Sequence, residues 1–330
     1  MDIHCRQFPT LHDRTDSTAV FPRAWEDLPN RSGPNRRLSV SGTIANVSDP
    51  MRVALATFGV EEFAVLHAAC VDAGHIPAAY VYCRSMKPNS STDAHAAAAV
   101  GQIVAALPPG MDFLLPGNPE GLAYELAGYN LDLLVVYGFN WKLPTTVLKT
   151  PRLGVINIHT SLLPKYRGPA PVLWAIRNGD PEIGLTIHRM DERFDSGPIL
   201  AQRGGIPLDE DVTPQSLWSR IHPVLTDLLT SAMDQVVRRV PGVPQNEAGR
   251  STAGFIEPAF SVVDWSRSAR EVHNQVRMYA FMGRDHAPVA RVGDRDLRVF
   301  RTRLEPAEGL RVECADAPIW IVDSTPATPR

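Results

Sequence analysis

The sequence lacks several features that assign a protein to a common class at once. It has four cysteines among 330 residues and no Cys-x-x-Cys pair, so neither a zinc site nor a disulfide framework is indicated and we expect no bound metal. No apolar run approaches the roughly 18 residues that a membrane span needs, and no apolar core of a secretory signal follows the N-terminus. These absences predict a cytoplasmic protein with reduced thiols and no membrane attachment.

Phosphate-binding loops and an excess of positive charge are also missing. The first predicted strand-to-helix turn offers only Gly59, so the G-x-G-x-x-G fingerprint is absent, and there is no Walker A motif. The formal net charge is −3, which provides no large cationic field to attract nucleic acid. A dinucleotide-binding domain, a P-loop enzyme and a general nucleic-acid binder are therefore disfavoured.

Short apolar runs alternate with amphipathic stretches from Met51 onward, and this pattern predicts an α/β fold. Strands alternating with helices imply a doubly wound parallel sheet, which binds its ligands beyond the carboxyl ends of the strands. The predicted strands are 52–57, 76–83, 112–115, 131–137 and 153–157, and the predicted helices are 61–73, 94–107, 117–127 and 214–240.

Composition divides the chain into four predicted segments. Residues 1–50 are rich in Arg, Asp, Pro and Ser without a sustained period and predict a disordered extension, with translation from Met51 as an alternative. Residues 51–240 form the α/β domain, and the Pro- and Gly-containing residues 241–262 form a linker. Short strands within 263–330 predict a small β domain resembling a barrel.

One stretch combines polar side chains with otherwise apolar sequence. Asn157 and His159 follow a predicted strand, and Asp195 lies in the predicted turn 194–198. An amide, an imidazole and a carboxylate together suit stabilisation of an oxyanion and transfer of a proton. We expect Asp195 to raise the pKa of His159 and keep it protonated. Each residue alone also fits a structural role: a turn cap, a buried backbone partner and an Asx-turn.

No nucleophile accompanies this set. Ser161 is nearby, but Leu-Leu-Pro follows it and no G-x-S-x-G elbow exists. The residues therefore favour acyl transfer to an external nucleophile over a covalent acyl-enzyme.

The strings NIHTSLLPKYRGPAP (157–171) and GLTIHRMDERFDSGPIL (184–200) resemble the signature of the folate-dependent formyltransferase family. The resemblance covers residues 51–323. It implies that 51–240 is a formyltransferase catalytic domain, with 10-formyltetrahydrofolate as formyl donor and an amine as acceptor. It also implies that Asn157, His159 and Asp195 are the catalytic residues.

The same resemblance implies two sets of binding residues. An apolar slot suits a pterin ring, although ordinary core packing explains the apolar members equally well. The implied folate-binding residues are Val136, Tyr137, Gly138, Phe139, Leu143, Met190, Asp191 and Phe194. The implied acceptor-binding residues are Ser161, Lys165, Tyr166 and Arg167, for which a solvated loop is the competing interpretation.

The acceptor is predicted from one loop. The family's tRNA enzymes carry a basic loop after the second strand, because phosphate contacts need Lys and Arg. Here residues 84–93 contain only Arg84 and Lys87 as basic residues. We therefore expect a small-molecule amine, such as an amino sugar nucleotide or a siderophore precursor, with methionyl-tRNA as the alternative. A formyltetrahydrofolate hydrolase and a non-enzymatic folate binder are further alternatives. A homodimer is compatible with the sequence, which does not fix the oligomeric state.

Overall fold

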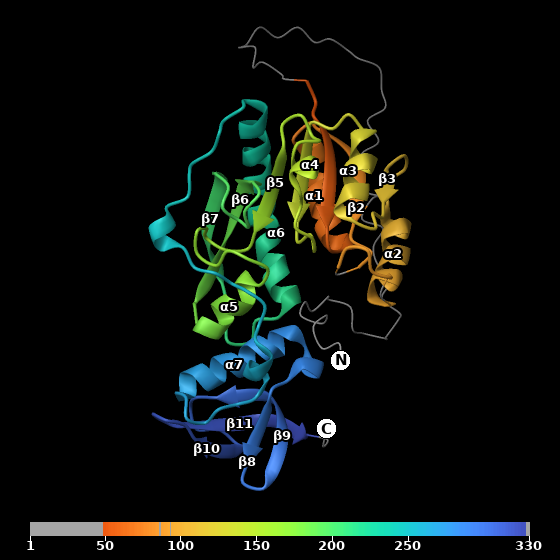
Figure 1. Cartoon of the computed structure of the whole chain (residues 1–330). Coiled ribbons are helices and arrows are strands. Elements are labelled where there is room, and N and C mark those ends of the chain that lie inside the picture. The colour runs from red at the N-terminus through yellow and green to blue at the C-terminus, as the bar shows by residue number, and fades with distance from the viewer. Residues whose placement is uncertain (1–48, 86, 93, 328–330) are drawn as a thin grey trace. The chain divides into compact units, whose positions relative to one another are not determined.

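The computed structural model describes residues 49–327 except Met86 and Asp93 (Figure 1). Apart from Asp49 and Pro50, the predicted extension 1–50 lies outside the described residues. The described part of the chain forms two compact units. We name them the N-terminal unit (49–155 and 233–240) and the C-terminal unit (156–232 and 241–327). No helix in the described part of the chain is both long and apolar enough to cross a membrane.

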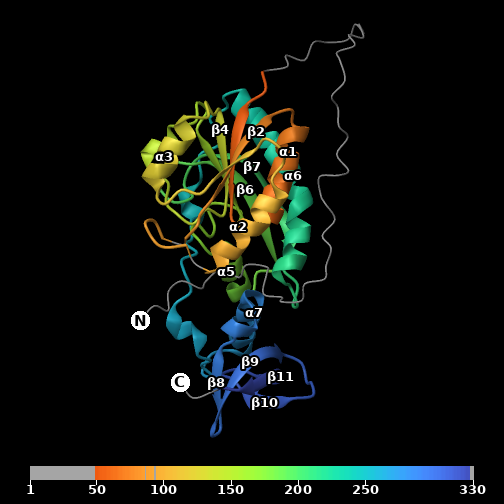
Figure 2. The ribbon, with the colours of Figure 1, turned by 90° about the vertical axis from the view of Figure 1, so that its right-hand side faces the viewer.

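The N-terminal unit is built on parallel strands in the order β3-β2-β1-β4. Strands β1 and β4 are buried along almost their whole length, as expected for a parallel sheet with both faces covered. Figure 2 shows α1 and α3 on opposite faces of these strands. The elements are β1 (Arg52–Thr57), α1 (Val60–Asp72), β2 (Ile76–Tyr82), α2 (Ala94–Ala106), β3 (Asp112–Leu114), α3 (Pro119–Ala127), β4 (Leu133–Tyr137) and α4 (Thr145–Leu148).

Local sequence explains where the helices of this unit start and how they pack. Asn118 caps α3 by accepting a 2.7 Å hydrogen bond from Gly121 N, and a proline occupies the first helical turn. Phe63 of α1 stacks on Tyr80 of β2 with ring centroids 4.2 Å apart. This aromatic contact packs α1 on the sheet, and the parallel pairing of β1 with β4 puts the carboxyl ends of both strands at one edge.

The first part of the C-terminal unit carries strands in the order β5-β6-β7, and β6 is antiparallel to both neighbours. The register places Asn157 opposite His188 and His159 opposite Thr186. The predicted α/β class is confirmed, but the antiparallel pairing of β6 with β5 and with β7 makes the sheet mixed where a parallel sheet was expected. The elements are β5 (Val155–His159), α5 (Pro171–Asn178), β6 (Glu182–Arg189), β7 (Ile199–Pro207) and α6 (Pro214–Val237).

The second part of the C-terminal unit is a four-stranded antiparallel sheet in the order β10-β11-β9-β8, which confirms the predicted small β fold. Helix α7 packs on it through Val272 and Val276, which meet Val299 and Ile319 in a common core (Figure 1). Burial of each such side chain contributes about 1.5–3 kcal/mol. The elements are α7 (Ala269–Met282), β8 (Val289–Val292), β9 (Arg295–Arg303), β10 (Leu310–Glu313) and β11 (Pro318–Pro326), with 3-10 turns η1 (Glu247–Gly249), η2 (Pro258–Ser261) and η3 (Arg284–His286).

Candidate active site

Three polar side chains converge in the C-terminal unit. Asn157 and His159 lie two residues apart on β5, so they face the same side of the strand. Asp195 comes from the turn between β6 and β7. Its Oδ1 accepts a hydrogen bond from Asn157 Nδ2 at 3.3 Å, and its Oδ2 lies 3.7 Å from His159 Nδ1. The structure therefore brings together all three residues that the sequence singled out.

The partners of His159 define which of its ring nitrogens carries the proton. Nε2 lies 2.8 Å from the carbonyl oxygen of Tyr166, and a carbonyl can only accept, so Nε2 carries the hydrogen. In the neutral imidazole, Nδ1 is then unprotonated and faces Asp195. His159 thus offers a fixed proton acceptor at Nδ1, with a carboxylate close enough to stabilise the imidazolium.

The pKa of His159 lies below its ordinary value of 6.5. Burial of the ring lowers it, and the opposing charge of Asp195 only partly compensates. The expectation that Asp195 keeps His159 protonated is therefore wrong, because desolvation outweighs the carboxylate. A neutral His159 at neutral pH suits a general base.

Asp195 is held as a carboxylate in a constrained backbone conformation. Its φ is 47°, a left-handed conformation that costs on the order of 1 kcal/mol and that Asp tolerates better than most residues. Burial raises its pKa, but His159, His188 and the Gly168 N–H, which donates to Oδ2 at 2.8 Å, lower it to about 2. The group is ionised throughout the physiological range.

His188 is a member of this cluster for which sequence reasoning assigned no role. Its Nδ1 lies 2.9 Å from Arg189 O and must donate, so in the neutral ring Nε2 accepts from Asn157 Nδ2 at 3.2 Å. His188 is 1% exposed and lies 3.5 Å from Asp195 Oδ1. The alternation of Ile183, Leu185 and Ile187 predicts the strand, but the pairing of His188 with Asn157 needs the sheet register.

Two glycines allow the backbone to close around the carboxylate. A Cβ at Gly197 would lie 1.8 Å from Arg189 O, so only glycine fits where the turn returns against β6. Gly168 has φ +118°, and a Cβ there would lie 2.7 Å from Ala253 O. Gly168 therefore both adopts a conformation that other residues avoid and presents its N–H to Asp195.

The predicted acceptor-binding residues have partners within the C-terminal unit. Ser161 Oγ donates to Lys165 O at 2.6 Å, which closes a local turn. Lys165 Nζ and Tyr166 Oη both contact Asp180, at 2.6 and 3.0 Å. Arg167 is buried, and its guanidinium contacts Gln245 and Glu247. Lys165 is the exposed member of this set, with half of its side chain accessible.

The predicted folate-binding residues fall into both units, and each group is described within its own. In the N-terminal unit, Val136 and Tyr137 end β4 in the core, and Leu143 is also buried. Gly138 turns the chain with φ +71°, and Phe139 packs edge-on against Trp141 at 5.6 Å.

In the C-terminal unit, three predicted folate-binding residues lie in the turn after β6. Asp191 Oδ1 accepts from Arg193 N and from Ser196 Oγ, both at 2.9 Å, and so shapes this turn. Phe194 is 64% exposed beside Asp195, and Met190 is half-buried. The exposed ring of Phe194 lies next to the hydrogen-bonded carboxylate of Asp195 in sequence, and a planar ligand can stack on such a ring.

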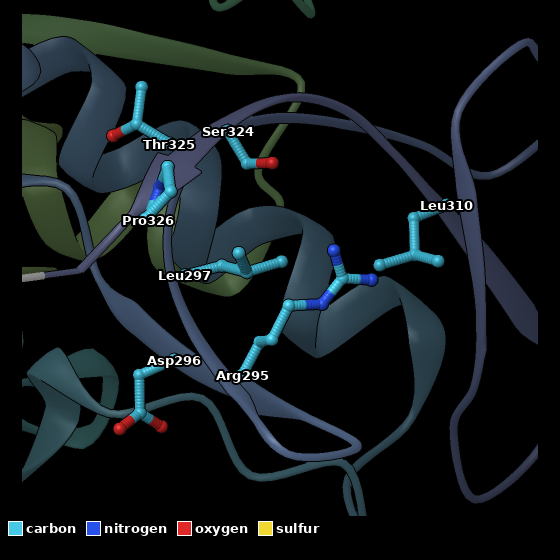
Figure 3. Close-up of a pocket in the computed structure, with 7 residues that line it drawn as sticks. All are labelled: Arg295, Asp296, Leu297, Leu310, Ser324, Thr325 and Pro326. Atoms are coloured by element: carbon cyan, nitrogen blue, oxygen red, sulfur yellow. The ribbon is translucent and has the colours of Figure 1, made fainter.

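A hollow of about 430 Å³ lies in the C-terminal sheet, away in sequence from the cluster (Figure 3). None of the predicted site residues lines it. The lining residues come from β9, β10 and β11 and are Arg295, Asp296, Leu297, Leu310, Ser324, Thr325 and Pro326.

The cluster brings an amide donor, an imidazole and a carboxylate together, and these are group types that acyl transfer can use. The family model described as "Formyl transferase" matches residues 51–233, more than half of the chain. The chain belongs to the formyl transferase family.

Relatives of known name agree with this membership. The chain is 35% identical over 204 residues to the methionyl-tRNA formyltransferase of Pelobacter propionicus, covering 58% of this chain and 62% of the relative. It is 33% identical over 279 residues to the methionyl-tRNA formyltransferase of Ruegeria pomeroyi, covering 82% and 88%. The first of these matches thus spans less than two thirds of that relative's length.

Among solved structures, WlaRD, a sugar 3N-formyltransferase studied with dTDP and 5-N-formyl-THF, has a similar fold. Its TM-score is 0.55 at 16% identity, covering 86% of this chain and all of WlaRD. At this identity the similarity concerns the fold alone.

Proposed function

We propose that this protein is an N-formyltransferase that moves the formyl group of 10-formyltetrahydrofolate to the amine of a small molecule. Asn157, His159 and Asp195 are its catalytic residues in this proposal. The observation that carries it is the convergence of an amide donor and a neutral buried imidazole on β5 with an ionised carboxylate in the turn between β6 and β7.

Asn157 provides the donor for the developing oxyanion. Its two amide hydrogens point to His188 Nε2 and Asp195 Oδ1 through bonds of 3.2 and 3.3 Å, which are long for N–H donors. A formyl oxygen that becomes negatively charged is a stronger acceptor than either partner. When Asn157 Nδ2 gives up one of these long hydrogen bonds to donate to the oxyanion, the transition state is stabilised more than the ground state.

His159 accepts the proton that the attacking amine loses. The amine nitrogen forms a bond to the formyl carbon, and its proton passes to His159 Nδ1, directly or through water. The bond between the formyl carbon and the folate nitrogen then breaks, and the proton is delivered to that nitrogen. Asp195 stabilises the intervening imidazolium.

The folate is proposed to contact the residues that the family resemblance implies. In the N-terminal unit, the buried side chains of Tyr137, at the end of β4, and of Leu143, in the loop that follows, provide apolar surface for this contact. The turn at Gly138 leaves backbone groups available to read the edge of a pterin. In the C-terminal unit, taken by itself, Met190, Asp191 and Phe194 are proposed to contact the folate from the turn that carries Asp195.

The loop 84–93 supports a small acceptor over tRNA. Of its two basic residues, Arg84 directs its guanidinium at Gly117, where a Cβ would lie 2.7 Å from Nη2. Burial raises the pKa of Glu125, and the charge of Arg84 opposes this rise. Of these two basic residues, Lys87 is exposed and Arg84 is half-buried. One exposed cation provides little of the phosphate neutralisation that tRNA binding requires. Lys165, at the rim of the proposed site, can contact an anionic acceptor such as a sugar nucleotide.

Methionyl-tRNA is the second candidate, because the two curated relatives compared above carry that name. The test is a panel of amino sugar nucleotides, hydroxylated ornithines and methionyl-tRNA offered with 10-formyltetrahydrofolate. We expect release of tetrahydrofolate that depends on a small amine. Rapid turnover only with methionyl-tRNA, weakened steeply by salt, would select the second candidate instead.

A further inference from the structure

The segment 243–253, predicted as part of a linker, is paired with both sides of the proposed active site. Val243 and Ile199 exchange two backbone hydrogen bonds of 2.8 Å just after the turn that carries Asp195. Arg167 and Thr252 form a parallel bridge, with Arg167 N donating to Ser251 O at 2.9 Å. The segment therefore spans the two loops between which the carboxylate lies.

Gln245 lies between these two attachments and contacts the turn directly. Its Nε2 donates to Asp195 O and to Gly197 O, both at 2.8 Å. These are the main-chain carbonyls on each side of the tightest point of the turn. The two hydrogen bonds thus hold the backbone on both sides of Ser196, next to a residue whose φ of 47° is rarely adopted without support.

Arg167 fixes the other end of the Gln245 amide. Its Nε and Nη2 donate to Gln245 Oε1 at 3.0 and 2.6 Å. Nη1 and Nη2 donate to Glu247 at 3.1 and 2.8 Å. An arginine can only donate and a carbonyl can only accept, so this orientation of the Gln245 amide is the one that satisfies all its neighbours. Both hydrogens and both lone pairs of the amide are used.

The same loop supplies the partners of the catalytic side chains. Residues 166–168 contribute the carbonyl that accepts from His159 Nε2 and the Gly168 N–H that donates to Asp195 Oδ2. Arg167 lies between these two groups. A single chain of contacts, from Glu247 through Arg167 and Gln245, therefore joins the loop that orients His159 to the turn that orients Asp195.

We propose that Gln245 is a positioning residue that holds Asp195 against His159 and Asn157, with Arg167 as its anchor. The proposal rests on the proposed function, because it assigns to Gln245 a part in the same transfer reaction. Gln245 acts through the main chain of the turn and not through contact with either substrate. Its loss is expected to lower kcat and to leave the KM values for donor and acceptor nearly unchanged.

Two variants of Gln245 test the proposal, and each changes only the amide group or what replaces it. Gln245→Met keeps the length of the side chain and removes all four hydrogen bonds. Gln245→Glu keeps an acceptor for Arg167 but places an oxygen against two carbonyl oxygens. The matched control is Gln275→Met, because Gln275 Nε2 also donates to two main-chain carbonyls, those of Phe260 and Val262, and its helix is not part of the site.

Each variant is assayed for tetrahydrofolate release, and amide hydrogen exchange is measured over residues 194–198. We expect both Gln245 variants to lose about 30- to 100-fold in kcat, the effect of misplacing a catalytic group by about 1 Å, with faster exchange in this turn. Gln275→Met is expected to keep kcat within about twofold, whatever it does to thermal stability.

Three results would overturn the proposal. They are a kcat near the wild-type value in Gln245→Glu, an equal loss in Gln275→Met, and unchanged exchange over 194–198. Failure of the proposed function is distinguishable, since the wild-type protein would then release no tetrahydrofolate with any acceptor. The hydrogen-exchange comparison would still decide whether Gln245 holds the turn.

Discussion

Two buried histidines of the C-terminal unit each lie beside a carboxylate, but the two pairs differ in geometry. His159 is 3.7 Å from Asp195, and its other ring nitrogen contacts a main-chain carbonyl. His273 Nε2 is 2.5 Å from Glu210, and its Nδ1 is 2.8 Å from Thr302 Oγ1. Burial lowers the pKa of both histidines, and the carboxylate opposes this in both.

This difference in geometry separates the proposed catalytic pair, His159 and Asp195, from the structural pair His273 and Glu210. Both ring nitrogens of His273 have close partners, and Glu210 is also paired with Arg270 and Arg277 at 3.6 Å each. Within residues 49–327, as far as they are described, the carboxylate facing His159 Nδ1 is that of Asp195 at 3.7 Å, and Asp195 lies beside two histidines. A nitrogen without a close partner can accept a proton, whereas a nitrogen already in a short hydrogen bond cannot do so without breaking it.

The largest expected effect is that of Asp195→Asn. It removes the charge that stabilises the His159 imidazolium, so we expect kcat to fall by about 10³-fold or more. Binding of formyl-folate, measured by fluorescence titration, should change little. The matched change Glu210→Gln should leave kcat within about twofold. Turnover of Asp195→Asn close to that of the wild type would contradict the assigned role.

His273→Leu should affect stability instead of rate. It leaves the buried Thr302 hydroxyl without its partner, which costs about 1–3 kcal/mol in the free energy of unfolding. Urea denaturation measures this loss, and kcat should be unchanged where the variant is fully folded. A large loss of kcat in folded His273→Leu would show that the two pairs do not differ in the way described.

Sequence patterns predicted the strands and helices of the N-terminal unit to within one or two residues in most cases. Apolar runs and Pro or Gly stops define them, as at α2, predicted as 94–107 and observed as Ala94–Ala106. Helix α5 and strand β6 lie outside the predicted elements, although the alternation of Ile183, Leu185 and Ile187 is typical of a strand.

The three polar residues of the site could be identified from their order in the sequence, but their supports could not. His188 meets Asn157 only through the antiparallel register of β5 and β6. Gln245 reaches Asp195 across 50 residues of intervening chain. Contacts of this kind depend on where the chain returns, which local propensity does not encode.

A moderate effect is expected for His188→Leu. Asn157 loses its neutral acceptor, and its amide is no longer held toward the formyl group. We expect kcat to fall about tenfold, equivalent to roughly 1.4 kcal/mol of transition-state stabilisation. His222→Leu on α6 is the matched change outside the cluster and should not alter kcat. Equal rates for the wild type and His188→Leu would assign His188 to packing alone.

The smallest expected effect concerns pH. His159 must be neutral to accept a proton, and its pKa lies below 6.5, so more than half of the enzyme should remain active at pH 6.5. Asp195, with a pKa of about 2, stays ionised over this range. The acid limb of the pH dependence of kcat/KM measures the pKa of His159. A midpoint above pH 6.5 would mean that the charge of Asp195 raises this pKa by more than burial lowers it.

The most direct measurement is a crystal structure of the protein with a formyl-folate analogue that cannot transfer its formyl group. The account predicts that the formyl oxygen lies within about 3 Å of Asn157 Nδ2, with His159 Nδ1 and Asp195 on the side from which the amine attacks. A formyl group that points away from these three residues, or an analogue bound in the hollow of the C-terminal sheet, would contradict it.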